Sequence, residues 1–174
     1  MPFIVMATQN PRGGSGTKEL PESQTDRFMI RITVGYPSRE DEIEILKGSR
    51  RSAALSLSAV ITPDDLLILR KQAAEVHVED SLFAYMVDIA AATRESPDIS
   101  LGISPRGTMA LSDMTRAHAL MEGRAYATPD DVLAVAPYTL SHRITLSGDA
   151  RFAGKTAASV LDDILKSVPM PELV

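Results

Sequence analysis

The chain has 174 residues, of which 44% are hydrophobic and 24% are charged, a composition typical of a globular protein. Acidic residues exceed basic ones by 23 to 18, giving a net charge of −5, so no nucleic-acid partner is expected, because such binding needs a basic surface. The absence of cysteine excludes disulfides, zinc–cysteine sites and a cysteine nucleophile. No apolar run approaches the ~20 residues of a membrane helix, and the N-terminus has no signal-peptide pattern. The sequence therefore predicts a soluble cytoplasmic protein with no membrane contact.

Two apolar runs near the N-terminus have the character of strands. Residues 2–7 are continuously apolar, which is typical of a strand buried on both faces of a parallel sheet. A second β-rich run covers residues 28–34, and a short helical turn is expected at 22–26 between them. Two strands cannot form a stable parallel sheet alone. We therefore expect residues 1–37 to be the end of an α/β domain whose other strands lie outside these residues, and to be poorly packed.

Beyond Pro37 the pattern is helical. Ser38 precedes an acidic first turn and an apolar face, which together indicate a helix start. The segments 62–65 and 128–131 both read Thr-Pro-Asp-Asp, with a capping Thr, Pro in the first turn and acids near the positive helix end. Further helices are predicted at 81–95, 105–122 and 155–168. The chain is thus predicted to be mainly α, with a helical bundle over 38–174 after the two-strand remnant over 1–37.

Several motifs that suggest catalysis or metal binding fail on inspection. Gly154-Lys155-Thr156 resembles the end of a phosphate loop, but the glycine required five positions before Gly154 is Asp149. The segment is therefore predicted to be a linker that enters a helix. The Asp pairs in the two Thr-Pro-Asp-Asp segments suit the helix dipole. The three histidines are too far apart for a zinc site, so no metal-binding residue is predicted.

Two polar positions stand out. Asn10 follows the first predicted strand, at the edge where open α/β sheets bind ligands, although an Asn-Pro pair is equally typical of a turn. Arg106 lies in the first turn of a predicted helix, where the dipole disfavours a cation by ~0.3–1 kcal/mol. A residue that breaks a local rule is a candidate for binding phosphate. A solvated arginine would also tolerate this small cost, so both interpretations stay open.

A series of short motifs in a fixed order resembles the MoxR family of AAA+ ATPases. These motifs are Val-Met-Ala-Thr-Gln-Asn-Pro (5–11), Asp-Arg-Phe (26–28), Val-Gly-Tyr-Pro-Ser (34–38), Ser-Pro-Arg (104–106), Glu-Gly-Arg-Ala-Tyr (122–126), Thr-Pro-Asp-Asp-Val (128–132) and His-Arg (142–143). The resemblance runs from the first residues to about Leu146. It implies that residues 1–37 end an AAA+ α/β P-loop NTPase core and that residues 38–174 form its helical lid domain.

The resemblance also implies roles for three residues. Asn10 matches the first sensor, which orients the hydrolytic water near the γ-phosphate. Arg27 matches the arginine finger, which reaches the nucleotide of a neighbouring subunit, and Arg106 matches the second sensor at the start of a lid helix. ATP and Mg²⁺ are the implied cofactors. The implied assembly is a homo-oligomeric ring that remodels protein complexes as a chaperone does, often with von Willebrand factor A-type partner proteins.

The sequence departs from the family in one important respect. The family's phosphate loop and its Mg²⁺-binding acidic strand precede the first-sensor strand, and the 174 residues contain neither. Because these parts cradle ATP and its metal, we predict that the chain alone does not turn over ATP. The alternative function is a non-enzymatic helical interaction module, in which Asn10, Arg27 and Arg106 are ordinary surface residues.

Overall fold

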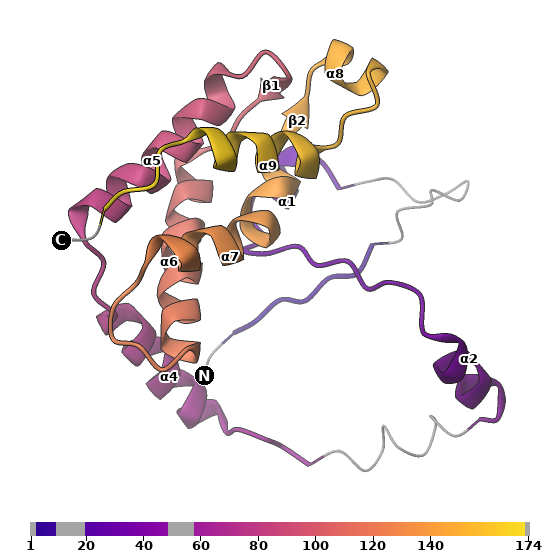
Figure 1. Ribbon diagram of the computed structural model, residues 1–174. Coiled ribbons are helices and arrows are strands. Elements are labelled where there is room, and N and C mark those ends of the chain that lie inside the picture. Colours follow the sequence, from indigo (N-terminus) through magenta and orange to yellow (C-terminus); the bar gives the residue numbers. More distant parts are fainter. Residues whose placement is uncertain (1–2, 10–19, 49–57, 173–174) are drawn as a thin grey trace.

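The computed structural model describes residues 3–9, 20–48 and 58–172, and Figure 1 shows a helical bundle with an extended N-terminal segment beside it. The elements in chain order are α1 (Glu22–Thr25), α2 (Arg39–Leu46), α4 (Pro63–Glu75), α5 (Asp80–Glu95), β1 (Ile99–Leu101), α6 (Pro105–Met121), α7 (Pro129–Leu140), the 3₁₀ turn η2 (Ser141–Arg143), β2 (Thr145–Leu146), α8 (Gly148–Phe152) and α9 (Ala157–Ser167). The predicted mainly α fold is confirmed.

The helices begin where the sequence places their caps. Ser38 accepts a hydrogen bond from the Asp41 amide at 3.1 Å and starts α2. Thr62 and Thr128 form capping boxes with the second aspartate of each Thr-Pro-Asp-Asp segment, at the starts of α4 and α7. The Gly-Lys-Thr segment is a linker as predicted, since Thr156 caps α9. These contacts satisfy backbone N–H groups that the first helical turn leaves unpaired.

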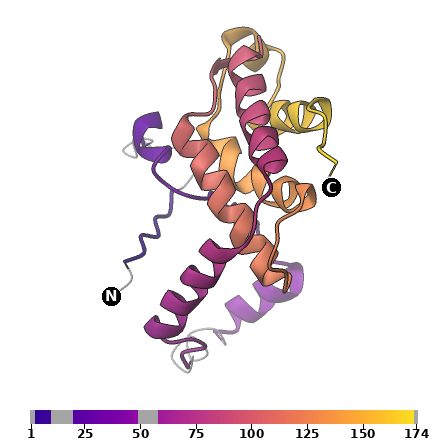
Figure 2. The same cartoon turned by 90° about the vertical axis from the view of Figure 1, so that its left-hand side faces the viewer.

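The core lies between helices α5, α6, α7 and α9. Helix α6 packs against α7, α5 and α4, while α9 packs across α5 and α7 (Figures 1 and 2). Apolar side chains spaced three or four positions apart turn toward this centre. The largest fully buried ones include Leu82, Met86 and Ile89 of α5, Leu111 of α6, Leu140 of α7 and Leu161 of α9.

A small antiparallel sheet joins two loops at one end of the bundle. Strands β1 and β2 pair Ile99 with Leu146, and the sequence analysis did not predict them. They have three and two residues, which is too short for an alternating apolar pattern to indicate a strand. The sheet brings the residues after α5 next to those after η2, and so helps to fix the start of α6 against η2.

The prediction of strands at 2–7 and 28–34 is wrong, because the described residues of both runs belong to no paired strand. A strand exists only through a ladder of hydrogen bonds to a neighbouring strand, and within the described ranges neither run has such a partner strand. Phe3 and Met6 are accordingly 88% and 91% exposed. The expected poor packing does not extend to Arg31, whose amide donates a 2.9 Å hydrogen bond to the carbonyl of Tyr138 in α7.

Helix α2, like α1 and α4, has no buried residue, and Figure 1 shows α2 away from the bundle. Among the described residues, no helix is both long and apolar enough to cross a membrane. The division into residues 1–37 and 38–174 stays a prediction, and hydrogen bonds from His142 and Arg143 to residues 26 and 28 join the two parts.

Candidate functional site

The carboxylate of Asp26 is the centre of a polar cluster at the start of α6. It accepts a hydrogen bond from Arg143 Nη1 at 2.7 Å and lies 3.2 Å from the hydroxyl of Ser104 through both oxygens. Ser104 is also the N-cap of α6. A carboxylate at this position is favoured by the positive end of the helix dipole, so Asp26 is held there by charge as well as by hydrogen bonds.

Arg143 anchors the segment around Asp26 from inside the bundle. Its side chain is 1% exposed, and its guanidinium donates to the backbone carbonyl of Thr139 at 2.9 Å and to that of Phe28 at 2.7 Å. It also donates to the backbone carbonyl of Asp26. A buried arginine is tolerated only when its charge and its donors are paired, and here a carboxylate and three carbonyls meet that need.

Two further contacts hold the same segment on η2 and β2. The carbonyl of Phe28 lies 3.0 Å from His142 Nε2, and Glu22 of α1 accepts a 2.7 Å hydrogen bond from Thr145. Burial lowers the pKa of His142, which favours the neutral ring that donates through Nε2. The Asp-Arg-Phe motif is therefore docked on the lid by both members of the His-Arg motif.

Arg106 lies on the solvent side of this cluster. Its side chain is 57% exposed, and its Nη1 is 3.7 Å from Asp26 Oδ2. This ion pair accounts for a cation in the first turn of α6, because a carboxylate from another part of the chain offsets the unfavourable dipole. At 3.7 Å and high exposure the pair is weak, so Arg106 can exchange Asp26 for another anion at low cost.

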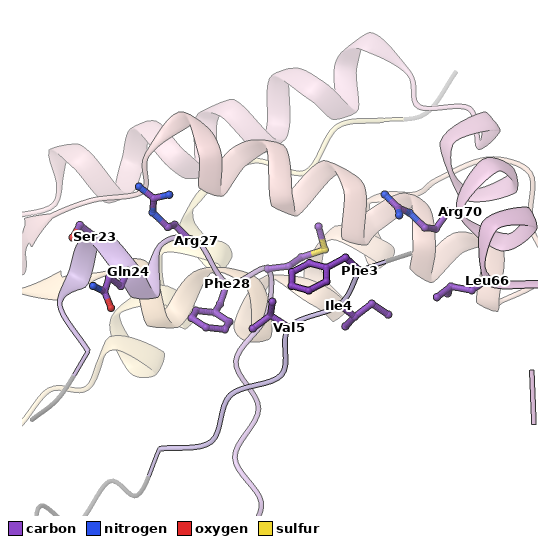
Figure 3. Close-up of a pocket in the computed structure, with 10 residues that line it drawn as sticks. Phe3, Ile4, Val5, Ser23, Gln24, Arg27, Phe28, Leu66 and Arg70 are labelled. Carbon is purple, nitrogen blue, oxygen red and sulfur yellow. The ribbon is translucent and has the colours of Figure 1, made fainter. Parts of the chain in front are cut away.

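Arg27 lies between Asp26 and Phe28, whose carbonyls are bound by Arg143, but Arg27 is itself exposed. In the described ranges, no hydrogen bond or ion pair joins its side chain to another residue, whereas both neighbouring carbonyls are bound by Arg143. The side chain lines an open pocket together with Phe3, Ile4 and Arg70, and Figure 3 shows Arg27 and Arg70 at opposite ends of this lining.

The three residues that the sequence analysis selected thus have different outcomes. Arg27 and Arg106 are both exposed cations near the Asp26 cluster. Arg27 follows Asp26 in the sequence, and Arg106 forms a 3.7 Å ion pair with it. Asn10 lies outside the described residues. Asp26 and Arg143 were not predicted to have a role. Their motifs were visible, but nothing in the sequence pairs two residues that are 117 positions apart.

A second buried carboxylate, Asp131, has a structural role. It is 1% exposed and accepts hydrogen bonds from Arg124 at 2.5 and 2.7 Å, with His118 Nδ1 at 2.6 Å from Oδ1. Burial alone raises the pKa of this carboxyl, but the hydrogen bonds from Arg124, His118 and Thr128 outweigh it, and the pKa lies well below its usual range. The interpretation of this Asp pair as a helix-capping feature is confirmed.

No group of three or more histidine, aspartate or glutamate side chains in ranges 3–9, 20–48 and 58–172 could hold a metal ion. The residues present suit an anion better than a cation, since the exposed members of the cluster, Arg27 and Arg106, are both positively charged. A phosphate group would satisfy the donors of such arginines. The described site therefore fits the phosphates of a nucleotide and offers no ligands for Mg²⁺.

Comparison with known families agrees with this geometry. Residues 91–164 match the family described as the AAA lid domain, and residues 1–30 match the ATPase family associated with various cellular activities. The fold is that of a proposed ATPase from Cytophaga hutchinsonii, with a TM-score of 0.81 and 30% identity over 94% of this chain and 53% of that one. Residues 91–164 of the helical part therefore resemble the lid domain of an AAA ATPase.

The sequence relatives narrow the class further. The chain is 40% identical to YeaC of Bacillus subtilis over 98% of its own length and 53% of that protein. It is 36% identical to the chaperone MoxR1 of Mycobacterium tuberculosis over 99% of its own length and 48% of that protein. Nearly the whole chain thus resembles part of the MoxR-type AAA ATPases. It spans about half the length of these relatives.

Proposed function

We propose that this chain supplies sensor and arginine-finger residues to a MoxR-like AAA ATPase, which couples ATP binding and hydrolysis to chaperone-like remodelling of protein complexes. Resemblance to this family supports the general activity, since one relative is named as a chaperone. The observation that carries the proposal is the Asp26 cluster. It joins the segment that bears Arg27 to the start of the helix that bears Arg106, and both arginines remain exposed.

Each selected residue has a role in this proposal. Arg106 binds the phosphates of a nucleotide, and Arg27 reaches a nucleotide held by a neighbouring subunit. Asn10 orients the attacking water, a role that rests on the sequence resemblance alone. Phosphoryl transfer needs positioned positive charge more than covalent chemistry, which two exposed arginines can provide. Mg²⁺ enters with ATP and takes its ligands from outside the described residues.

The proposed assembly follows from the same roles. An arginine finger acts only on a neighbouring subunit, so the working form is a homo-oligomeric ring in the cytoplasm. Partner proteins of the von Willebrand factor A type are the proposed adaptors to the remodelled complexes. The exposed apolar residues of 3–6 and 29–36 are available for contacts with further α/β structure. Such contacts are expected if residues 1–37 are the end of an AAA+ α/β core.

The test is ATP hydrolysis by a polypeptide that joins these 174 residues to a MoxR-type phosphate-loop segment. We expect Arg27→Ala to lower kcat on the order of 10³-fold, and Arg106→Ala to lower kcat/KM. Arg151→Ala is the matched control, because Arg151 is an exposed arginine of α8 whose side chain has no hydrogen bond or ion pair with Asp26 or Arg143 in the described part of the chain. If Arg27→Ala and Arg106→Ala both behave like Arg151→Ala, the interaction-module alternative is correct.

A further inference from the structure

We propose that Arg143 and Asp26 are positioning residues for Arg27, fixing its backbone to the lid so that Arg27 and Arg106 move as one unit. This inference rests on the proposed function for its consequence in hydrolysis, but the docking itself is a property of the lid and can be tested separately. The proposal explains why Arg143 is buried, which the sensor and arginine-finger roles do not explain.

The geometry around Arg27 carries the argument. The carbonyl that precedes Arg27 belongs to Asp26 and the one that follows belongs to Phe28, and both accept hydrogen bonds from the single guanidinium of Arg143. The planar guanidinium holds its donors in a fixed arrangement. The backbone on both sides of Arg27 is therefore tied to one rigid group, while its side chain stays exposed.

Arg143 is itself held firmly. Its Nε donates to Thr139 in the last turn of α7, and its side chain packs beside Gly107 in the first turn of α6. Burying an arginine is costly, and well-packed apolar residues often stabilise a protein as well or better. Arg143 donates hydrogen bonds to three backbone carbonyls, one in α7 and two in the Arg27 segment. These bonds point to a role in positioning rather than in stability alone.

Asp26 connects this anchor to Arg106. The carboxylate is shared, with Arg143 at 2.7 Å and Arg106 at 3.7 Å. A phosphate that attracts Arg106 removes only the longer and more exposed of these contacts. Asp26 remains bound by Arg143 and Ser104, so the Arg27 segment stays docked while Arg106 changes its partner. Movement of the lid upon nucleotide binding is thereby transmitted directly to Arg27.

Hydrogen exchange on the 174-residue chain tests the docking without any need for ATP hydrolysis. The reporter is the Arg31 amide, which donates to Tyr138 and is protected only while the segment is docked. We expect Asp26→Asn and Arg143→Lys to lose this protection and to retain protection in α5. If Arg143→Lys also loses protection in α5, that variant has lost its fold, and the Asp26→Asn result alone is used. Asp26→Asn should keep the fold, because Asp26 is 24% exposed and asparagine is nearly isosteric with it. Retained Arg31 protection in Asp26→Asn would overturn the proposal.

A double-mutant cycle in the ATPase-competent polypeptide tests the consequence for hydrolysis. Misplacing a catalytic group by about 1 Å can cost on the order of 10²-fold, so we expect Asp26→Asn to lower kcat by roughly 10-fold to 100-fold with KM little changed. In an Arg27→Ala background the same substitution should have no further effect. An equal loss in both backgrounds would mean that Asp26 does not act through Arg27.

Arg124→Lys is the matched control for both experiments. Arg124 also pairs with a buried carboxylate of the lid, at 2.5 Å from Asp131, but it contacts neither the Arg27 segment nor Arg143. It should leave Arg31 protection and the coupling to Arg27 unchanged. If Arg27→Ala has no effect on hydrolysis, the proposed function fails, while the exchange experiment still reports whether the segment is docked.

Discussion

Gly107 lies directly beneath the side chain of Arg143, where a Cβ atom on Gly107 would come within 3.0 Å of Arg143 Cδ. The same Cβ would lie 2.7 Å from Cγ2 of Ile103, a distance that forces a neighbour to move. Glycine in the third position of α6 is therefore a steric requirement of the buried arginine. It lets the start of α6 approach Arg143 closely enough for Ser104 and Arg143 to share Asp26.

Gly107→Ala should destabilise the chain even though alanine is the better helix former. The gain in helix propensity is about 1 kcal/mol, whereas overpacking a buried site costs ~1–3 kcal/mol, and it would also displace Arg143. Chemical unfolding of the 174-residue chain measures the difference. Gly148→Ala is the control, because a Cβ on Gly148 meets no atom within 4 Å. A Gly107→Ala variant as stable as Gly148→Ala would contradict the packing argument.

The sequence was sufficient to predict the longer helices, though not the short α8, because their signals are local. Thr62 and Thr128 cap α4 and α7 where the Thr-Pro-Asp-Asp segments begin, and each cap depends on residues within one turn. The strands could not be predicted in the same way. The apolar run that contains Phe3 and Met6 has the composition of a buried strand, but its pairing depends on residues elsewhere in space.

The site shows the same division between local and distant signals. The position of Arg106 in a helix first turn marked it as unusual from sequence alone, and Asp26 is the physical reason that the position is tolerated. The partner could not be foreseen, because α2, α4, α5 and β1 separate Asp26 from Arg106 along the chain. Likewise, the burial of Arg143 depends on the glycine at 107, which looks unremarkable, or even unfavourable, in a helix.

Asp131 should make the stability of the lid dependent on pH in the acid range. Its pKa in the folded chain lies below the ordinary value, so its stabilising contribution is present above the usual aspartate pKa of about 4 and is lost as pH falls below it. Urea unfolding between pH 3 and pH 7 should show a decline toward low pH that is smaller in Asp131→Asn. That variant should also lose on the order of 3 kcal/mol at pH 7, because Arg124 loses its charged partner.

Asp130→Asn is the control for this experiment, since Asp130 is an exposed acid in the same helical turn and takes no part in the contacts with Arg124 and His118. If Asp131→Asn retains the full acid-dependent decline, these contacts do not hold the carboxylate charged in the way that the structure indicates.

Residues Ile4–Ala7 should exchange their amide hydrogens rapidly in the monomeric 174-residue chain. Phe3, Val5 and Met6 are more than half exposed, and the described residues here have no paired strand, so little opposes local opening. Amides in α5 should exchange far more slowly, because Leu82 and Ile89 are fully buried. Strong protection of Ile4–Ala7 in the monomer would mean that this segment packs without further sheet structure.

Mixing of subunits should separate the roles of the two arginines. If Arg27 acts on a neighbouring nucleotide, a subunit with Arg27→Ala can still hold ATP, while a subunit with a disabled phosphate loop can still offer its Arg27. Each variant alone should be inactive in the ATPase-competent polypeptide, and their mixture should regain a fraction of the hydrolysis rate at interfaces where an intact loop meets an intact Arg27. The rate on titrating one variant into the other measures this.

The same mixture made with Asp26→Asn in place of Arg27→Ala should behave alike, because a misplaced Arg27 is lost from the same interfaces. A different result is expected if Asp26→Asn is placed in the subunit whose phosphate loop is disabled. Both defects then fall on one chain, and the Arg27→Ala partner, whose phosphate loop is intact, receives no properly placed Arg27 from it. Mixing should therefore restore roughly 10-fold to 100-fold less activity than the mixture with an intact Asp26. Equal restoration in both mixtures would show that Arg27 works without the Asp26 anchor and that docking on the lid serves stability alone.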